Sequence, residues 1–205
     1  MSKFISNEFK SIPDFSFGTD YSSIYPDYID FGVGDPDLRT DKIIIDALYQ
    51  GALNGATHYD TPQGNIGLRK AICKFYQEEY DFALEPEEVV ITISGCQAMY
   101  TVAKTICNPG DEIIIPSPYF SPYTHQIQLA GGTPVYLETK SEEDFVVNVE
   151  ELRKMVNPKT KAIIINTPNN PTGACIPKET LKNIYELAVE KDIVVICDDI
   201  YTLFT

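Results

Sequence analysis

The apolar run IVVIC at residues 193–197, with AIII at residues 162–165 before it, decides the fold class. Both runs are rich in β-branched residues and contain no polar residue, as strands do when both faces of their sheet are covered. Three further apolar runs occur earlier in the chain, at Val89–Ile93, Glu112–Ile115 and Thr133–Leu137. Stretches able to form helices separate the runs, near residues 96–107, 119–130, 148–156 and 178–190. This alternation predicts a three-layer α/β/α fold around a mostly parallel sheet.

The pattern is different at the N-terminal end. The first thirty residues are rich in Phe, Tyr, Ser and Asp and show no sustained period, which predicts an arm that packs against something else. Two helices are predicted to follow, at Asp41–Leu53 and Ile66–Tyr80, because apolar residues recur there at helical spacing.

Polar residues follow both defining runs. Asn169-Asn170-Pro171-Thr172-Gly173 comes after the run at 162–165, and Asp198, Asp199 and Tyr201 come after the run at 193–197. Open α/β sheets bind ligands at the carboxyl ends of their strands, so these residues predict a binding site. The alternative for the Asn-Pro-Thr-Gly segment is a turn that only reverses the chain. Spacing does not choose between the two aspartates, because adjacent strand residues point to opposite faces.

A third polar segment, Ser94-Gly95-Cys96-Gln97, opens the helix predicted near residues 96–107. The first backbone N–H groups of a helix are unpaired and the helix dipole favours an anion beside them, so this turn could hold a phosphate. The alternative is a turn with an ordinary N-cap. The segment contains neither GxGxxG nor GxxxxGK[ST], so a nucleotide fingerprint is not supported.

Composition excludes several classes of protein. The 205 residues carry a net charge of −14, which opposes binding to nucleic acid or to an anionic membrane. No apolar stretch is long enough to span a bilayer and no signal-peptide pattern opens the chain, so we expect a cytoplasmic location. The five cysteines have no CxxC spacing and the two histidines lie far apart, so no metal site is expected.

Seven segments, taken in their order and spacing, resemble the class I/II aminotransferases of the fold-type I pyridoxal-phosphate superfamily. The resemblance runs from about Phe31 to the end of the chain. Its segments are Phe31–Asp37, His58–Arg69 (with Pro62-Gln63-Gly64 and Leu68-Arg69), Ser94–Ala98, Pro109–Glu112, Ser117–Phe120, Asn169–Gly173 and Asp198–Tyr201. It implies that residues 1–48 form an arm and a small-domain segment, and that residues 49–205 form an incomplete cofactor-binding large domain.

The resemblance also implies pyridoxal 5′-phosphate as cofactor and gives roles to individual residues. Asp198 is similar to the acid that pairs with the pyridine nitrogen and keeps it protonated. Asn170 and Tyr201 resemble the partners of the ring's 3-oxygen, and Gly95 and Cys96 resemble the backbone cradle for the phosphate.

Three further residues receive roles in the same way. Phe120 resembles the aromatic that stacks on the cofactor ring, although a core aromatic is a serious alternative. Tyr59 resembles the tyrosine that reaches the phosphate of the neighbouring subunit, which implies a homodimer. Gly34, together with Asn170, resembles the residues that contact the substrate.

The chain departs from the family pattern in small ways and in one large way. Asp35 and Asp199 stand where glutamate is more usual, and Cys96 follows Gly95 where other side chains are common. No lysine follows Lys191, so the family's Schiff-base lysine has no counterpart and no catalytic residue is assigned. The other lysines considered for that role, Lys104, Lys178 and Lys182, lie on predicted helices and are expected to be exposed.

The sequence is therefore consistent with three functions. The first is the N-terminal part of an aminotransferase, which moves an amino group between an amino acid and a 2-oxo acid. The second is a pyridoxal-phosphate-dependent carbon–sulfur lyase of the same superfamily, and the third is a truncated, non-catalytic product. In each case we expect the 205-residue chain alone to be marginally folded and without transaminase activity.

Overall fold

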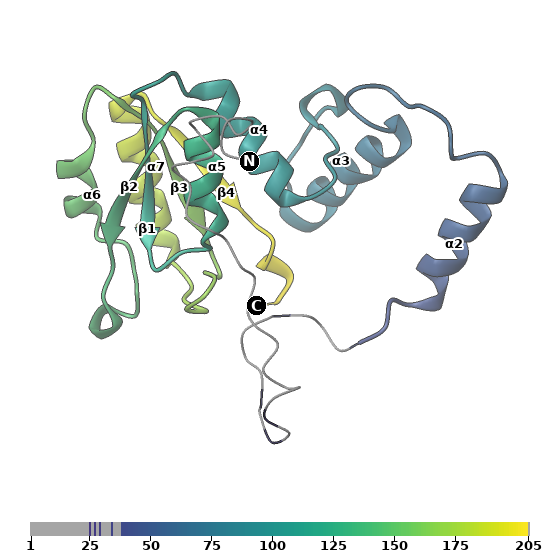
Figure 1. The fold of residues 1–205 in the computed structure, drawn as a ribbon, viewed down its shortest axis with the longest axis horizontal. Coiled ribbons are helices and arrows are strands. Elements are labelled where there is room, and N and C mark those ends of the chain that lie inside the picture. Colours follow the sequence, from purple (N-terminus) through teal and green to yellow (C-terminus); the bar gives the residue numbers. More distant parts are fainter. Residues whose placement is uncertain (1–24, 26, 28, 30–33, 35–37, 205) are drawn as a thin grey trace, which may run out of the picture. The chain divides into compact units, whose positions relative to one another are not determined.

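The computed structural model describes residues 25, 27, 29, 34 and 38–204 (Figure 1). Most of the predicted N-terminal arm and most of the segment Phe31–Asp37 lie outside the described residues. The chain divides into two compact units, residues 1–91 and residues 92–205. The domain boundary expected between residues 48 and 49 remains a prediction.

The described part of the first unit is helical. Helix α2 spans Lys42–Leu53 and helix α3 spans Ile66–Tyr80, which confirms both helices predicted from the sequence. Asp41 caps α2, but no side chain of this helix is buried. A short 3₁₀ helix, η2, spans Pro86–Glu88.

A buried arginine organises the chain around α3. The guanidinium of Arg69 donates to the carbonyl oxygens of Gly64 (3.2 Å) and Pro86 (2.8 Å) and to the side chain of Gln63 (3.2 Å). Gly64 has φ +94°, and a Cβ built on it would lie 2.5 Å from the Cβ of Ile91. Glycine is therefore required at this turn both by its backbone conformation and by the close approach of Ile91.

The second unit is built on a four-stranded parallel sheet (Figure 1). Its strands lie in the order β2-β1-β3-β4, with β1 at Glu112–Ser117, β2 at Thr133–Glu138, β3 at Thr160–Asn166 and β4 at Val194–Asp198. Its helices are α4 at Gly95–Ile106, α5 at Pro122–Ala130, α6 at Val149–Met155 and α7 at Lys178–Lys191. Short 3₁₀ helices occur at Ser141–Glu143 (η3) and Thr202–Phe204 (η4). The predicted α/β fold with a parallel sheet is confirmed.

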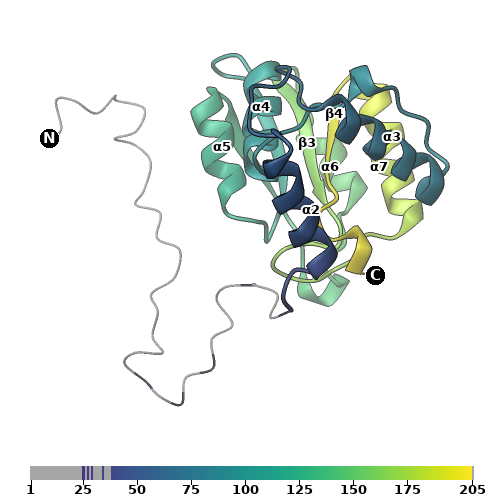
Figure 2. The ribbon, with the colours of Figure 1, turned by 90° about the vertical axis from the view of Figure 1, so that its right-hand side faces the viewer.

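Helices cover both faces of this sheet (Figure 2). Side chains of α4 and α5 pack with Ile113, Ile115 and Ile164 in one apolar cluster, whereas those of α6 and α7 pack with Ile114 and Ile163 in another. Successive isoleucines thus enter opposite clusters, as the two-residue period of a strand requires. From β1 the chain moves outward to β2 through α5, and it then crosses to β3 and β4 through α6 and α7. Because crossovers are right-handed, this change of direction places α5 on the opposite face from α6 and α7.

One predicted strand is wrong. Val89–Ile93 is rich in β-branched residues, yet it forms no strand in the structure. Val89 has extended backbone angles, and the N–H of Ile91 donates to the carbonyl oxygen of Gln63 at 2.9 Å. None of the four strands pairs with this segment, and Ile93 is fully exposed. β-Propensity depends on pairing and packing with a neighbouring strand, and no described strand pairs with this segment.

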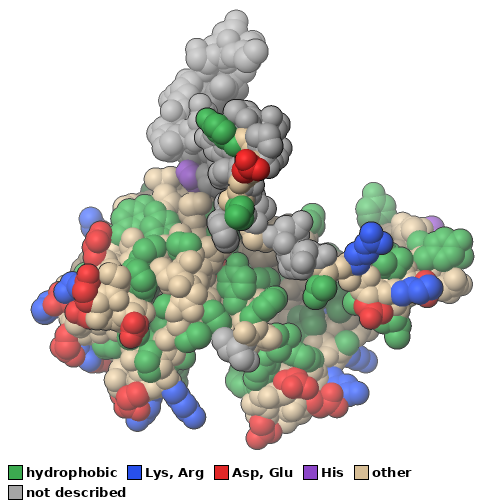
Figure 3. Space-filling view, turned by 90° about the horizontal axis from the view of Figure 1, so that it is seen from below, with side chains coloured by type: hydrophobic (Ala, Val, Ile, Leu, Met, Phe, Trp, Pro, Cys, Tyr) green, Lys and Arg blue, Asp and Glu red, His purple; other side chains and the backbone are tan. Residues whose placement is uncertain are grey.

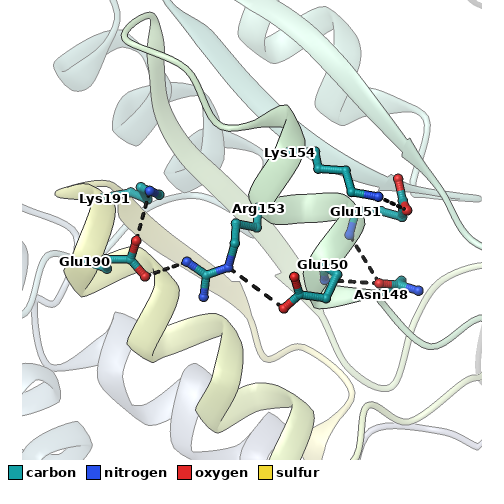
Figure 4. A network of polar contacts seen from close by, with 7 residues as sticks. All are labelled: Asn148, Glu150, Glu151, Arg153, Lys154, Glu190 and Lys191. Atoms are coloured by element: carbon teal, nitrogen blue, oxygen red, sulfur yellow. Dashed lines mark hydrogen bonds and ion pairs between the residues drawn. The ribbon is translucent and has the colours of Figure 1, made fainter.

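The outer surfaces of α6 and α7 carry a network of charged side chains (Figure 4). Arg153 of α6 pairs with Glu190 of α7 and with Glu150, and Glu190 also pairs with Lys191 at 2.9 Å. The hydrogen bond from Arg153, followed by that from Lys191, lowers the pKa of Glu190 from 4.5 to about 2. The side chain of Asn148 caps α6 by accepting from the N–H groups of Glu150 and Glu151.

On the face drawn in Figure 3, basic and acidic side chains lie interspersed. Within the described residues, no helix combines the length and the apolar composition needed to cross a membrane.

Candidate functional site

An open cavity of about 180 Å³ lies in the second unit and collects most of the polar residues predicted from the sequence. It is lined by Ser94, Gly95, Cys96, Met99, Phe120, Tyr123, Gln126, Asn166, Asn170, Asp198, Ile200 and Tyr201. These residues come from the start of α4, from α5 and its preceding loop, and from the carboxyl ends of β3 and β4. Connections leave β1 and β3 in opposite directions, and α/β sheets bind ligands at such a switch point.

The start of α4 forms one end of the cavity. The Ser94 hydroxyl accepts from the N–H of Gln97 (3.4 Å) as an N-cap, and the Gln97 side chain accepts from the N–H of Ile93 (2.7 Å). No carbonyl of the helix can accept from its first-turn N–H groups, which include those of Gly95 and Cys96. Nothing lies within 4 Å of the position a Cβ would take on Gly95, so a ligand can approach the backbone there. This end is suited to an anion.

The carboxylate of Asp198 forms another part of the lining, where β4 ends. Its Oδ2 accepts from the Tyr123 hydroxyl at 2.6 Å, and its Oδ1 accepts from the N–H of Ile200 at 3.3 Å. Burial, and then the hydrogen bond to Asp198, raise the pKa of Tyr123 far above its ordinary value. The phenol therefore stays protonated and donates to the carboxylate. Asp199, which spacing could not separate from Asp198, is exposed and does not line the cavity.

Asn170 and Tyr201 lie side by side in the lining. The Asn170 amide donates to the Tyr201 hydroxyl at 3.1 Å, although 31 residues separate the two in sequence. Asn166, the last residue of β3, holds this wall together. Its Oδ1 accepts from the backbone N–H of Asn170 at 2.8 Å, and its Nδ2 donates to the carbonyl oxygen of Asp198 at 2.9 Å. The Asn-Pro-Thr-Gly segment thus reverses the chain and also presents a side chain to the cavity.

Phe120 lies between the apolar core and the cavity. The ring is half-buried against the apolar cluster under α4 and α5, and it also lines the cavity. Its edge-to-face contact with Tyr123 has a centroid distance of 5.5 Å and an interplanar angle of 80°. A flat ligand in the cavity therefore has an aromatic side chain in the wall beside it.

Two predicted site residues belong to the first unit. Gly34 and Tyr59 precede residue 92, and their expected contacts with substrate and cofactor remain predictions. The Tyr59 side chain is fully exposed.

None of the lysines among the described residues lines the cavity. Lys104, Lys178 and Lys182 are exposed, as expected from their helices. Lys104 donates to the carbonyl oxygen of Ala130, and Lys182 pairs with Glu186. Within the described residues, no group of three or more His, Cys, Asp and Glu side chains could hold a metal ion.

Three polar lining residues were not predicted from the sequence: Tyr123, Gln126 and Asn166. Asn166 carried a usable signal, because it directly follows the apolar run of β3, as Asp198 follows that of β4. Tyr123 and Gln126 lie on α5, and a polar residue on a helix is more often exposed. Their burial depends on how α5 packs against the sheet.

Comparison with known proteins agrees with this arrangement. The sequence model of the family described as Aminotransferase class I and II matches residues 26–205. An aspartate aminotransferase of Bacillus sp. (strain YM-2) is 39% identical over 176 residues, which cover 85% of this chain and 45% of that protein. The structure of the Thermus thermophilus aspartate aminotransferase with maleate matches with a TM-score of 0.80 and 39% identity, over 82% of this chain and 44% of that one.

An aromatic aminotransferase of Pyrococcus horikoshii matches with a TM-score of 0.81 and 37% identity, over 84% of this chain and 46% of that one. The chain thus spans slightly less than half the length of these relatives.

Proposed function

Because the chain belongs to the class I and II aminotransferases, which depend on pyridoxal 5′-phosphate, we propose that residues 92–205 form the part of a transaminase that holds this cofactor. The reaction proposed for the whole enzyme moves an amino group between an amino acid and a 2-oxo acid. The observation that carries the proposal is one cavity with an anion-binding helix start and a carboxylate in its lining. The cofactor has a phosphate and a protonatable ring nitrogen, so these groups match its chemistry.

Six of the lining residues have a role that their positions support. The first-turn N–H groups at Gly95 and Cys96 bind the phosphate. Asp198 accepts from the protonated ring nitrogen, and its negative charge favours the protonated form. Asn170 and Tyr201 hydrogen-bond the 3-oxygen, and Phe120 lies against the ring. When bound, the cofactor supplies an electron sink for the α-carbon of the amino acid.

The described residues that line the cavity include no lysine, which supports a second part of the proposal. The chain by itself binds the cofactor without forming a covalent bond to it, and it does not catalyse transamination. In the whole enzyme, Gly34 contacts the substrate and Tyr59 reaches the phosphate in a neighbouring subunit of a homodimer. The relatives described above are aminotransferases, which supports transfer of an amino group over elimination.

The two neighbouring aspartates provide a matched test. Pyridoxine 5′-phosphate has the phosphate and the ring but no aldehyde, so its binding, followed by fluorescence, is independent of lysine chemistry. Asp198→Asn removes the charge that pairs with the ring nitrogen, and we expect at least ~10-fold weaker binding, as for the loss of one charged hydrogen bond. Asp199→Asn, one residue away and outside the cavity, should leave the affinity unchanged.

Two results would contradict this proposal. One is a wild-type chain that does not bind pyridoxine 5′-phosphate, and the other is equal loss of affinity in the two variants. Activity is tested separately by adding an amino acid, a 2-oxo acid and pyridoxal 5′-phosphate to the chain. Amino-group transfer above the rate without protein would refute the inactivity of the chain alone.

A further inference from the structure

Two buried polar side chains of α5 contact opposite parts of the same cavity. Tyr123 is 2% exposed and Gln126 is 9% exposed, and both line the cavity. They are three residues apart, so they lie on the same face of the helix. That face also carries Ile127 and Ala130, which pack in the apolar cluster of α4 and the sheet. The helix is therefore fixed by its apolar side chains while two polar ones reach the site.

Tyr123 contacts the acidic part of the lining. Its hydroxyl donates to Oδ2 of Asp198 at 2.6 Å, across 75 residues of sequence. A hydrogen bond donated to a carboxylate restricts its orientation. Tyr123 thus determines where the carboxylate of Asp198 is held.

Gln126 contacts the anion end. Its Nε2 donates to the carbonyl oxygen of Cys96 at 3.1 Å, in the first turn of α4. Its Oε1 is buried and has no hydrogen-bond partner among the described residues. An unpaired buried acceptor costs about 1–3 kcal/mol, so an apolar side chain of similar size would favour folding. Stability alone therefore does not account for glutamine at this position.

We propose that α5 sets the spacing of the cofactor site: Gln126 positions the first turn of α4, Tyr123 positions Asp198, and the helix between them fixes the distance from anion site to carboxylate. This inference rests on the proposed function, since it names the residues that align the two ends of the same site. Both are positioning residues, because each acts on the ligand through another group. One rigid helix holding both contacts favours a ligand whose anion and ring nitrogen are a fixed distance apart.

Three ligands separate the two ends of the site. Inorganic phosphate binds only at the anion end, pyridoxine has the ring but no phosphate, and pyridoxine 5′-phosphate has both. Gln126→Met removes the contact to Cys96 at nearly constant volume, and Tyr123→Phe removes only the hydroxyl. The matched controls are Gln128→Met, on the exposed side of the same helix, and Tyr185→Phe, on the exposed side of α7.

We expect a reciprocal pattern of affinities. Gln126→Met should weaken phosphate and pyridoxine 5′-phosphate by about 10-fold and leave pyridoxine unchanged, whereas Tyr123→Phe should weaken pyridoxine and pyridoxine 5′-phosphate and leave phosphate unchanged. The controls should change none of the three. Gln126→Met should also be at least as resistant to urea as the wild type, because it removes a buried amide whose oxygen has no hydrogen-bond partner among the described residues.

The outcomes distinguish this inference from the proposed function. A wild-type chain that binds none of the three ligands overturns the proposed function and the inference with it. A wild-type chain that binds pyridoxine 5′-phosphate, with variants that weaken all three ligands alike or none of them, overturns only the inference. Equal weakening of all ligands would show that α5 supports the fold and does not align the two ends.

Discussion

The two faces of the sheet differ in where they keep their polar groups. Under α6 and α7 the cluster of buried side chains is entirely apolar, and the charged groups lie on the outer surface, as in the Arg153–Glu190 pair. Under α4 and α5 the buried set includes Tyr123 and Gln126, and a cavity opens beside them. Burial of apolar area stabilises a fold, whereas buried polar groups are neutral or costly unless they are paired. The difference indicates that the α6/α7 face supplies stability and the α4/α5 face supplies the binding site.

The largest expected effect lies on the α6/α7 face. Leu187 of α7 is 1% exposed, and Leu187→Ala should lower the free energy of unfolding by about 2–5 kcal/mol through lost burial and the resulting cavity. Urea denaturation measures this loss. The affinity of the folded variant for pyridoxine 5′-phosphate should stay at the wild-type value. A large fall in that affinity would show that the α6/α7 face also contributes to the binding site.

An effect of intermediate size is expected from substitutions at two helix N-caps, one on each face of the sheet. Ser94 caps α4 beside the cavity and Asn148 caps α6, and either change to alanine should cost about 1 kcal/mol of stability. Only Ser94→Ala should also weaken pyridoxine 5′-phosphate, because it loosens the turn that binds the phosphate. If Asn148→Ala weakened the ligand equally, the anion end would not be specific to α4.

The smallest effect concerns the exposed ion pair between α6 and α7. The pKa of Glu190 is lowered to about 2 in the folded chain, so its stabilising contribution is present above its ordinary value of 4.5 and is lost as the pH falls through 2. Arg153→Met should remove this contribution and lower the urea midpoint slightly at pH 6, by an amount that salt reduces. Below pH 2 the variant and wild-type midpoints should converge. A difference that persists there would assign a packing role to the Arg153 side chain instead.

The sequence predicted most of the second unit because its signals are local. Apolar runs placed β1, β2, β3 and β4 within a few residues, and helical potential near 178–190 matches α7 at Lys178–Lys191. The prediction failed at Val89–Ile93, a β-branched run with which no described strand pairs. It also began the helix near 119 too early, because α5 begins at Pro122 and Phe120, in the loop before it, lines the site.

The candidate site was likewise predicted only in part from the sequence. The sequence by itself determined that polar residues follow the strands, because a buried apolar run ends where its first polar residues begin. The resemblance favoured Asp198 over Asp199, but only the tertiary structure showed that its carboxylate faces the cavity, that Asn166 joins β3 to β4, and that Tyr123 and Gln126 point inward. Those contacts join residues 30 to 75 positions apart, so they depend on how the helices and strands pack.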